Sequence, residues 1–399
     1  MTAWVVAGWL AARPTAHALG FRLADQDPLA TARGNAFVAT ADDAAAVYYN
    51  PAGLTQLDGH QVRIGAYGIG LEYDFTPAGG AAFRTKSRAD LVPQIFYADS
   101  LRDWPVAFGL GLYSPFGLAI EWPENPQFGA LYEKLTTLTL NPAVAWQVHP
   151  TLSIAAGVTV NYANLELRQR ALTAVPGSVN RFEGDDFDTG YNLGVLWQPM
   201  KAHSFGVTYR STTTQNLTGT ATTTGAGGLD GSGAASARVP FPRIVTCGYS
   251  FRPTPEWNFE FNADWTQWER LTTVNFQQPA GTFPVAFNWR SSWCYEFGVT
   301  RRLADGWRVS AGYIFSENSA PSANFLMLVP DLDRHIFSVG VGRQLGRVNW
   351  DVGYQLGWGP GRTVAGSALP FPLPANSATA DGHYTFLSHA LTAAIGFRF

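Results

Sequence analysis

The strongest constraint on the fold of this 399-residue chain is an alternation of apolar with polar or small residues that keeps returning between residues 61 and 399. From Leu138 to Val148 the even positions are Leu, Leu, Pro, Val, Trp and Val, and the odd positions are Thr, Asn, Ala, Ala and Gln. Successive side chains of a strand point to opposite faces, so each such segment predicts a strand with one apolar face. We count about 14 segments of about ten residues, the length that a tilted strand needs to cross a bilayer.

The opposite face of these segments distinguishes a membrane barrel from a soluble sandwich. Charged residues make up only 14% of the chain, against about a quarter in ordinary soluble domains. The positions opposite the apolar residues are mostly polar, and they include the charged Glu260, Asp264 and Asp351. They are Asn258, Glu260, Asn262 and Asp264 in one segment and Asn349, Asp351, Gly353 and Gln355 in another. A charge on the lipid face costs about 2–4 kcal/mol at mid-bilayer for Arg or Lys, so a membrane barrel keeps its charges inside. We therefore predict an all-β fold, a transmembrane antiparallel β-barrel.

The chain before the barrel divides into two parts. Residues 1–18 are predicted to be a signal peptide, because an apolar run from Trp4 to Ala12 is followed by the small-x-small pattern Ala16-His17-Ala18. Residues 19–60 show no sustained two-residue period, and their Asn-Pro and Gly signals favour a compact irregular element with short helical pieces. Residues 61–399 are the predicted barrel.

Two further predictions concern the cysteines and the polar tracts. Cys247 shares a face with the apolar residues of its segment, whereas Cys294 lies opposite them. Their sulfurs should face lipid and lumen respectively, so we expect no disulfide. The tracts from Thr212 to Ala237 and from Ala365 to Ala380 are predicted to be surface loops.

Several short motifs stand out along the chain. The most specific lies in the N-terminal element, where Asp42 and Asp43 precede Asn50, Pro51, Ala52, Gly53 and Leu54. Others are Gly20-Phe21, Tyr113 to Leu118, Trp265 to Trp268, Asn288-Trp289-Arg290 and Pro330 to Arg334. With these motifs the chain resembles the FadL/TodX family of outer-membrane transporters of long-chain fatty acids and aromatic hydrocarbons. The resemblance spans almost the whole mature chain and implies a 14-stranded barrel with an N-terminal hatch, here residues 19–60, inside the lumen.

The resemblance also implies a route for cargo. Cargo would bind in a pocket beside the start of the hatch and leave sideways through a gap at a kink in the third strand, which maps onto Ser114, Pro115 and Gly117. A kink there has a physical reason, since Pro115 lacks a ladder N–H and Gly117 tolerates a bent backbone. We expect Phe21, Phe116 and Leu118 to line the pocket.

The resemblance also implies partners for a carboxylate: Arg290 matches a basic position after Trp in similar sequences, and Arg168 and Arg170 lie near another basic position. Arg suits bidentate contact with a carboxylate. If no Arg reaches the lumen, a neutral hydrocarbon becomes the favoured cargo. The sequence leaves open whether the cargo is a fatty acid, an alkane, an aromatic hydrocarbon or a terpenoid.

These features predict a passive transporter of hydrophobic small molecules. Its expected partners are the cargo and the lipid of a Gram-negative outer membrane. A general porin is the alternative, and a barrel lipase a more distant one because no nucleophile motif accompanies the seven His. No phosphate-cradling loop suggests energy coupling. The net charge of −3 argues against nucleic acid. We expect a monomer, no catalytic residues, no metal and no cofactor.

Overall fold

The computed structural model describes residues 20–101, 104–124, 129–172, 175–368 and 379–399. The predicted signal peptide, residues 1–18, lies outside these residues, as does most of the predicted loop from Ala365 to Ala380. No helix among the described residues is long and apolar enough to cross a membrane.

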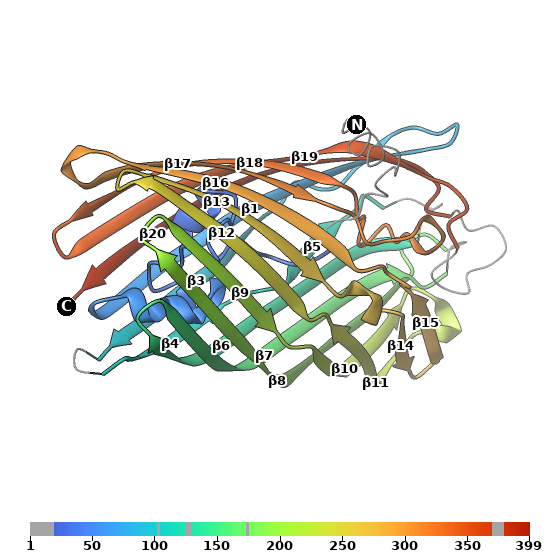
Figure 1. Cartoon of the computed structure of the whole chain (residues 1–399). Coiled ribbons are helices and arrows are strands. Elements are labelled where there is room, and N and C mark those ends of the chain that lie inside the picture. Colours follow the sequence, from blue (N-terminus) through green and yellow to red (C-terminus); the bar gives the residue numbers. More distant parts are fainter. Residues whose placement is uncertain (1–19, 102–103, 125–128, 173–174, 369–378) are drawn as a thin grey trace, which may run out of the picture.

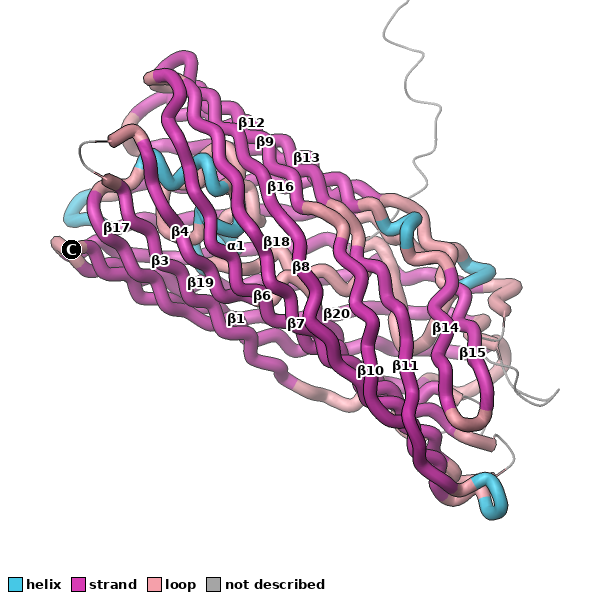
Figure 2. The backbone as a smooth tube through the Cα atoms, turned by 90° about the horizontal axis from the view of Figure 1, so that it is seen from below, coloured by secondary structure: helices cyan, strands magenta, loops and turns pink. Residues whose placement is uncertain are grey.

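The strands form one closed antiparallel barrel, in which β1 pairs with β3 on one side and with β20 on the other. Within the described residues, nine barrel strands are continuous: β1 (Gly59–Pro77), β3 (Ala89–Ser100), β6 (Ala130–His149), β7 (Leu152–Arg170), β8 (Val179–Met200), β17 (Trp307–Ser316), β18 (Arg334–Leu345), β19 (Val348–Val364) and β20 (Gly382–Arg398). Figures 1 and 2 show the strands running obliquely around the molecule.

Five more barrel strands are interrupted and consist of two segments each: β4 (Val106–Tyr113) with β5 (Gly117–Glu121), β9 (His203–Arg210) with β10 (Thr213–Thr224), β11 (Gly231–Phe241) with β12 (Ile244–Thr254), β13 (Trp257–Thr266) with β14 (Thr273–Gln278), and β15 (Gly281–Ala286) with β16 (Ser292–Arg302). The short β2 (Phe83–Arg84) pairs with the end of β1. The predicted count of 14 strands is therefore confirmed.

One end of the barrel has tight turns and the other has longer connections. Among these connections are the short 3-10 turns η2 (Gly227–Leu229), η4 (Ala304–Gly306) and η5 (Ser322–Asn324), and a further one, η3 (Trp268–Arg270), lies in the interruption between β13 and β14. The C-terminus lies at the tight-turn end (Figure 1), where for example only Gly346 and Arg347 connect β18 to β19. In outer-membrane barrels the short turns face the periplasm, so the predicted membrane barrel would have its periplasmic side at this end.

The two faces of the wall have the predicted polarity. Outward-facing Val158 and Val339 are 54% and 56% exposed, whereas inward-facing Glu260 and Asp351 are 4% and 2% exposed. The cysteines follow the same rule: both are free, Cys247 is exposed and Cys294 is buried. The prediction of no disulfide is confirmed.

The prediction of a loop from Thr212 to Ala237 was wrong. These residues belong to the hairpin of β10 and β11, paired in continuous register from Thr213 opposite Phe241 to Thr223 opposite Gly231. β10 also pairs with the start of β8. The backbone ladder, with the inward-facing Leu217 and Ala221 packed in the core, stabilises strands that lack a continuous apolar face.

Residues 20–58, here called the N-terminal segment, lie within the barrel. The segment contains α1 (Pro28–Ala32), α2 (Ala46–Tyr49) and the 3-10 helix η1 (Pro51–Gln56), none long enough to be stable alone. Its residues are almost all buried, and its helices contact strands on several sides of the wall. The wall therefore provides the packing that these short helices need.

Close packing between the segment and the wall depends on glycines. A Cβ on Gly312 of β17 would lie 2.1 Å from the backbone N of Gly34, and one on Gly206 of β9 would lie 2.3 Å from the backbone O of Val38. Both distances are well below any normal contact, so at these two points the backbone of the segment approaches the wall more closely than a side chain would allow.

Candidate functional site

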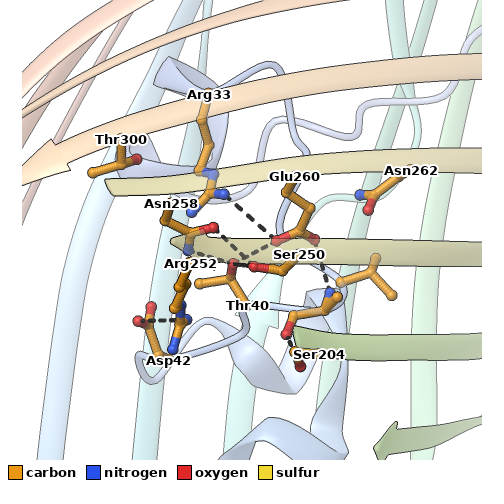
Figure 3. A network of polar contacts seen from close by, with 12 residues as sticks. Arg33, Thr40, Asp42, Ser204, Ser250, Arg252, Asn258, Glu260, Asn262 and Thr300 are labelled. Carbon is orange, nitrogen blue, oxygen red and sulfur yellow. Dashed lines mark hydrogen bonds and ion pairs between the residues drawn. The ribbon is translucent and has the colours of Figure 1, made fainter. Parts of the chain in front are cut away.

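Polar contacts tie the N-terminal segment to the wall (Figure 3). The buried carboxylate of Glu260 on β13 accepts hydrogen bonds from the Ala39 N–H, at 2.8 Å, and from the Thr40 hydroxyl. Arg33 lies 3.5 Å from the same carboxylate. A buried charge of this kind is tolerated because it is paired and hydrogen-bonded, so Glu260 fixes the position of the segment.

The Asp-Asp and Asn-Pro-Ala-Gly residues singled out in the sequence are part of this attachment. Asn50 caps η1 by accepting from the Ala52 N–H at 3.2 Å, and its amide donates to the Val38 and Val195 carbonyls at 2.8 and 3.0 Å. Asp42 pairs with Arg252 and Arg302 of the wall, at 3.3 and 3.1 Å. The motif residues thus form contacts within the N-terminal segment and between the segment and the barrel wall.

Pro51, Gly53 and Asp43 complete the motif. Pro51 begins η1, where its missing N–H costs nothing. A Cβ on Gly53 would lie 2.3 Å from the Ala41 carbonyl oxygen. Asp43 accepts from the Ala45 N–H at 2.9 Å and lies 3.7 Å from Arg63 of β1.

The third barrel strand is broken between β4 and β5. β4 pairs with β3 from Ile95 opposite Leu112 to Ser100 opposite Ala107. Among the described residues β5 pairs only with β6, so residues 89–94 of β3 have no strand partner on that side. Beyond the break, the Lys86 N–H donates to the Glu121 carbonyl at 2.8 Å. The wall therefore has a bounded gap between β3 and β5.

The backbone at the break pairs with the N-terminal segment instead. The Leu23 N–H donates to the Pro115 carbonyl and the Gly117 N–H donates to the Phe21 carbonyl, both at 2.9 Å. The side chain of Gln26 donates to the Ser114 carbonyl at 2.8 Å and accepts from the Ser114 N–H at 3.3 Å. Residues 21–26 thus satisfy the groups that a neighbouring strand would otherwise satisfy.

A cavity of about 380 Å³ lies at this break. It is lined mainly by apolar and aromatic side chains, among them Phe21, Phe116, Leu118, Leu71, Tyr73 and Phe386. Ser114 and Gly117 line it as well, whereas Pro115 does not. Its volume is within the range of about 300–1,000 Å³ that is typical of small-molecule pockets.

The cavity extends from the lumen to the outside of the wall. Its lining includes Leu135 and Thr137 of β6, which face inward and are buried, and also Thr136 and Leu138, which lie on the outward face of the same strand. Leu91, at the edge of the gap, is 75% exposed and lines it too. A cavity that touches both faces of the wall must pass through the gap.

The structure does not bring Arg290 or Arg168 to this cavity. Arg290 is exposed, and its backbone N–H donates to the Ser319 carbonyl at 2.9 Å. Arg168 lies 2.7 Å from Glu166, with its guanidinium 4.9 Å from the ring centre of Tyr132. The neighbouring Arg170 pairs with Glu124 at 3.1 Å. None of the three arginines lines the cavity.

Other charged residues line the cavity, and the sequence did not single them out for cargo: Arg22, Asp25, Arg88, Asp90, Lys134 and Arg334. Arg22 lies 2.5 Å from Asp264 on the opposite wall. Arg334 lies 3.7 Å from Asp331 in the loop after β17, and burial raises the pKa of the Asp331 carboxyl while Arg334 opposes this rise. Arg334 could have been noticed, because it ends the Pro330 to Arg334 match.

Comparison with known proteins identifies the family of this chain. Residues 9–397 match the family model described as "Outer membrane protein transport protein (OMPP1/FadL/TodX)". The chain belongs to this family. It is therefore an outer-membrane β-barrel of the FadL/TodX type, as the sequence motifs indicated.

Individual members of the family are distant in sequence and close in fold. The long-chain fatty acid transport protein of Salmonella typhi is 24% identical over 345 residues, which cover 76% of this chain and 78% of that protein. A FadL homologue of Pseudomonas aeruginosa superposes with a TM-score of 0.84 at 18% identity, covering 95% of this chain and all of the other. The Pseudomonas putida toluene transporter TodX gives 0.76 at 18% identity, with coverages of 95% and 100%. The structural likeness shows a shared fold.

Proposed function

We propose that this FadL/TodX member carries hydrophobic small molecules across the outer membrane passively, and that the 380 Å³ cavity is their binding site. The observation that carries the proposal is an apolar cavity placed beside the N-terminal segment and continuous with the gap in the wall. Relatives described as transporters of long-chain fatty acids and of toluene support the same class of cargo. Initial uptake of labelled fatty acids and hydrocarbons, in cells with and without the chain, tests it.

We further propose that cargo leaves through the gap between β3 and β5. A molecule released there enters the bilayer without crossing water, which favours apolar cargo. The sharpest test places a bulky residue on the outer mouth. Thr136→Trp adds a ring to a residue that lines the cavity, whereas Leu140→Trp changes a residue on the same face of β6 that does not. We expect the first variant to slow uptake and the second to leave it unchanged; equal uptake in both would exclude this exit.

Residues 20–58 are proposed to act as a hatch that must shift for cargo to pass. Thr40 of the segment and Ser250 of β12 have hydroxyl oxygens 3.3 Å apart and are both buried. Replacing both by Cys, in a chain with Cys247→Ala and Cys294→Ala, allows a reversible lock. We expect oxidation to stop uptake and reduction to restore it. Uptake that continues in the oxidised protein would show that the hatch need not move at this point.

Two alternatives predict different measurements. A general porin would give steady ion conductance in a planar bilayer, whereas a barrel with its lumen occupied by residues 20–58 should conduct little. A lipase would release fatty acid from phospholipid, and we propose instead that cargo crosses unchanged. One chain should suffice for transport, because the pairing of β1 with β20 leaves no barrel edge to be completed by a second copy.

A further inference from the structure

The outer mouth of the cavity carries an unbalanced set of charges. Arg88, just before β3, and Lys134 of β6 both line the cavity there, and Asp90 is the carboxylate between them. Asp90 lies 3.2 Å from Arg88 but 3.9 Å from Lys134. The longer distance exceeds that of a hydrogen bond. Two cations therefore share one carboxylate, and Lys134 is the less well paired of the two.

Lys134 lies at the level where the apolar outer surface ends. On the outward face of β6, the apolar residues Leu138 and Leu140 are followed toward the extracellular end by Thr136 and Lys134. On β7, the residue opposite Lys134 is Glu166, which comes after the apolar Val158 and Val160 on the same face. Charged side chains cost little at the interface, in contrast to the bilayer centre. An ammonium group can therefore remain charged there while it faces the cavity.

The arrangement suits an amphipathic anion. The aliphatic and aromatic lining around Phe21, Phe116 and Leu118 would hold an apolar chain, and the mouth would offer the Lys134 ammonium group to a terminal carboxylate. Such a bond is charge-assisted and stronger than a neutral one. A neutral hydrocarbon would gain nothing from Lys134, and a cationic amphiphile would be repelled by it.

We propose that Lys134, assisted by Arg88, forms a headgroup subsite at the exit and makes the chain favour monocarboxylates with an apolar tail over neutral molecules of equal length. This inference rests on the proposed function, because it assumes that the cavity carries cargo. It assigns the carboxylate contact to the exit and not to Arg290 or Arg168.

The experiment compares dodecanoate with dodecan-1-ol, which have the same chain length but differ in charge at neutral pH. Uptake above that of vector-only cells is measured for the wild-type chain and for Lys134→Met, Lys134→Arg and Lys201→Met. Lys201→Met is the matched control, since Lys201 does not line the cavity and lies in the turn between β8 and β9, away from the gap. Heat-modifiable mobility in gels verifies that each variant forms its barrel.

We expect Lys134→Met to lower the apparent affinity for dodecanoate by about fivefold, the size of a partly exposed ion pair, and to leave dodecan-1-ol uptake unchanged. Lys134→Arg should retain the preference for the acid, and Lys201→Met should behave like the wild type. Equal loss of both cargoes, or no loss of either, would overturn the headgroup subsite while leaving the proposed transport intact. A wild-type chain that carries neither cargo would overturn the proposed function itself.

Discussion

Breaking the Arg22–Asp264 ion pair should release the part of the N-terminal segment that pairs with the break in the third strand. Arg22 Nη1 lies 2.5 Å from Asp264 Oδ1, and the two side chains are 7% and 1% exposed. In Arg22→Met the Asp264 carboxylate stays buried without its cation. Removing one partner of a buried pair costs about 3–5 kcal/mol.

The structure places the expected cost at the lower end of that range. Asp264 keeps two other donors, the hydroxyl groups of Thr246 at 2.5 Å and Thr266 at 3.2 Å. We therefore expect about 3 kcal/mol, which corresponds to about a 150-fold change in the equilibrium between the attached and the released segment. The barrel itself should stay closed, because the β1–β20 ladder does not involve Arg22.

Amide hydrogen exchange measures this local opening directly. The amides to follow are those of Leu23 and Gly117, whose hydrogen bonds join the segment to the break. Both should exchange about 150-fold faster in Arg22→Met. In the double variant Arg22→Met, Asp264→Leu most of the protection should return, because replacing both members of a buried pair by apolar residues is often neutral.

The control is Arg84→Met, which breaks an exposed ion pair with Asp74 and should not alter either amide. Unchanged exchange of Leu23 and Gly117 in Arg22→Met would refute the idea that this pair holds the segment against the break. Equal acceleration in the double variant would show that the effect comes from lost packing of the Arg22 side chain and not from an uncompensated charge.

Two further predictions concern the wall. Gly312→Ala should destabilise the attached N-terminal segment by about 1–3 kcal/mol, seen as faster proteolysis of residues 20–58, because its Cβ would lie 2.1 Å from Gly34 N; Gly68→Ala, where the nearest atom is 3.6 Å away, should have no such effect. Val339→Arg, on the lipid face, should lower folding stability in lipid vesicles by about 2–4 kcal/mol. A similar loss from Ser338→Ala, on the inward face, would contradict the assignment of the two faces.

The barrel could be predicted from the sequence because its signal is local. Each strand repeats the same two-residue period, so the face of a residue such as Glu260 or Val339 is fixed by its immediate neighbours. The exception was the hairpin of β10 and β11. Its Thr, Gly and Ala residues carry a weak apolar pattern, and its pairing with β8 depends on residues more than 30 positions away.

The cavity was harder to predict because its charged residues come from distant parts of the chain. The aromatic residues Phe21 and Phe116 stand in motifs that the sequence displays. Lys134 belongs to none of these motifs, and its position at the outer mouth of the cavity depends on the gap between β3 and β5. Arg22 lies next to Phe21, but its partner Asp264 is 242 residues away. A local sequence pattern cannot indicate ion pairs between residues so far apart in the chain.

Phe21 contacts both the cavity and the break in the wall. Its ring lines the cavity and contacts the rings of Phe116 and Trp268, with centroids 6.1 and 4.7 Å away. Its carbonyl oxygen accepts the hydrogen bond from the Gly117 N–H. If the proposed cargo moves the Phe21 backbone together with its ring, it also strains the hydrogen bond between Phe21 and Gly117 at the break. Binding in the cavity and the width of the gap should change together, which separate residues for the two tasks would not require.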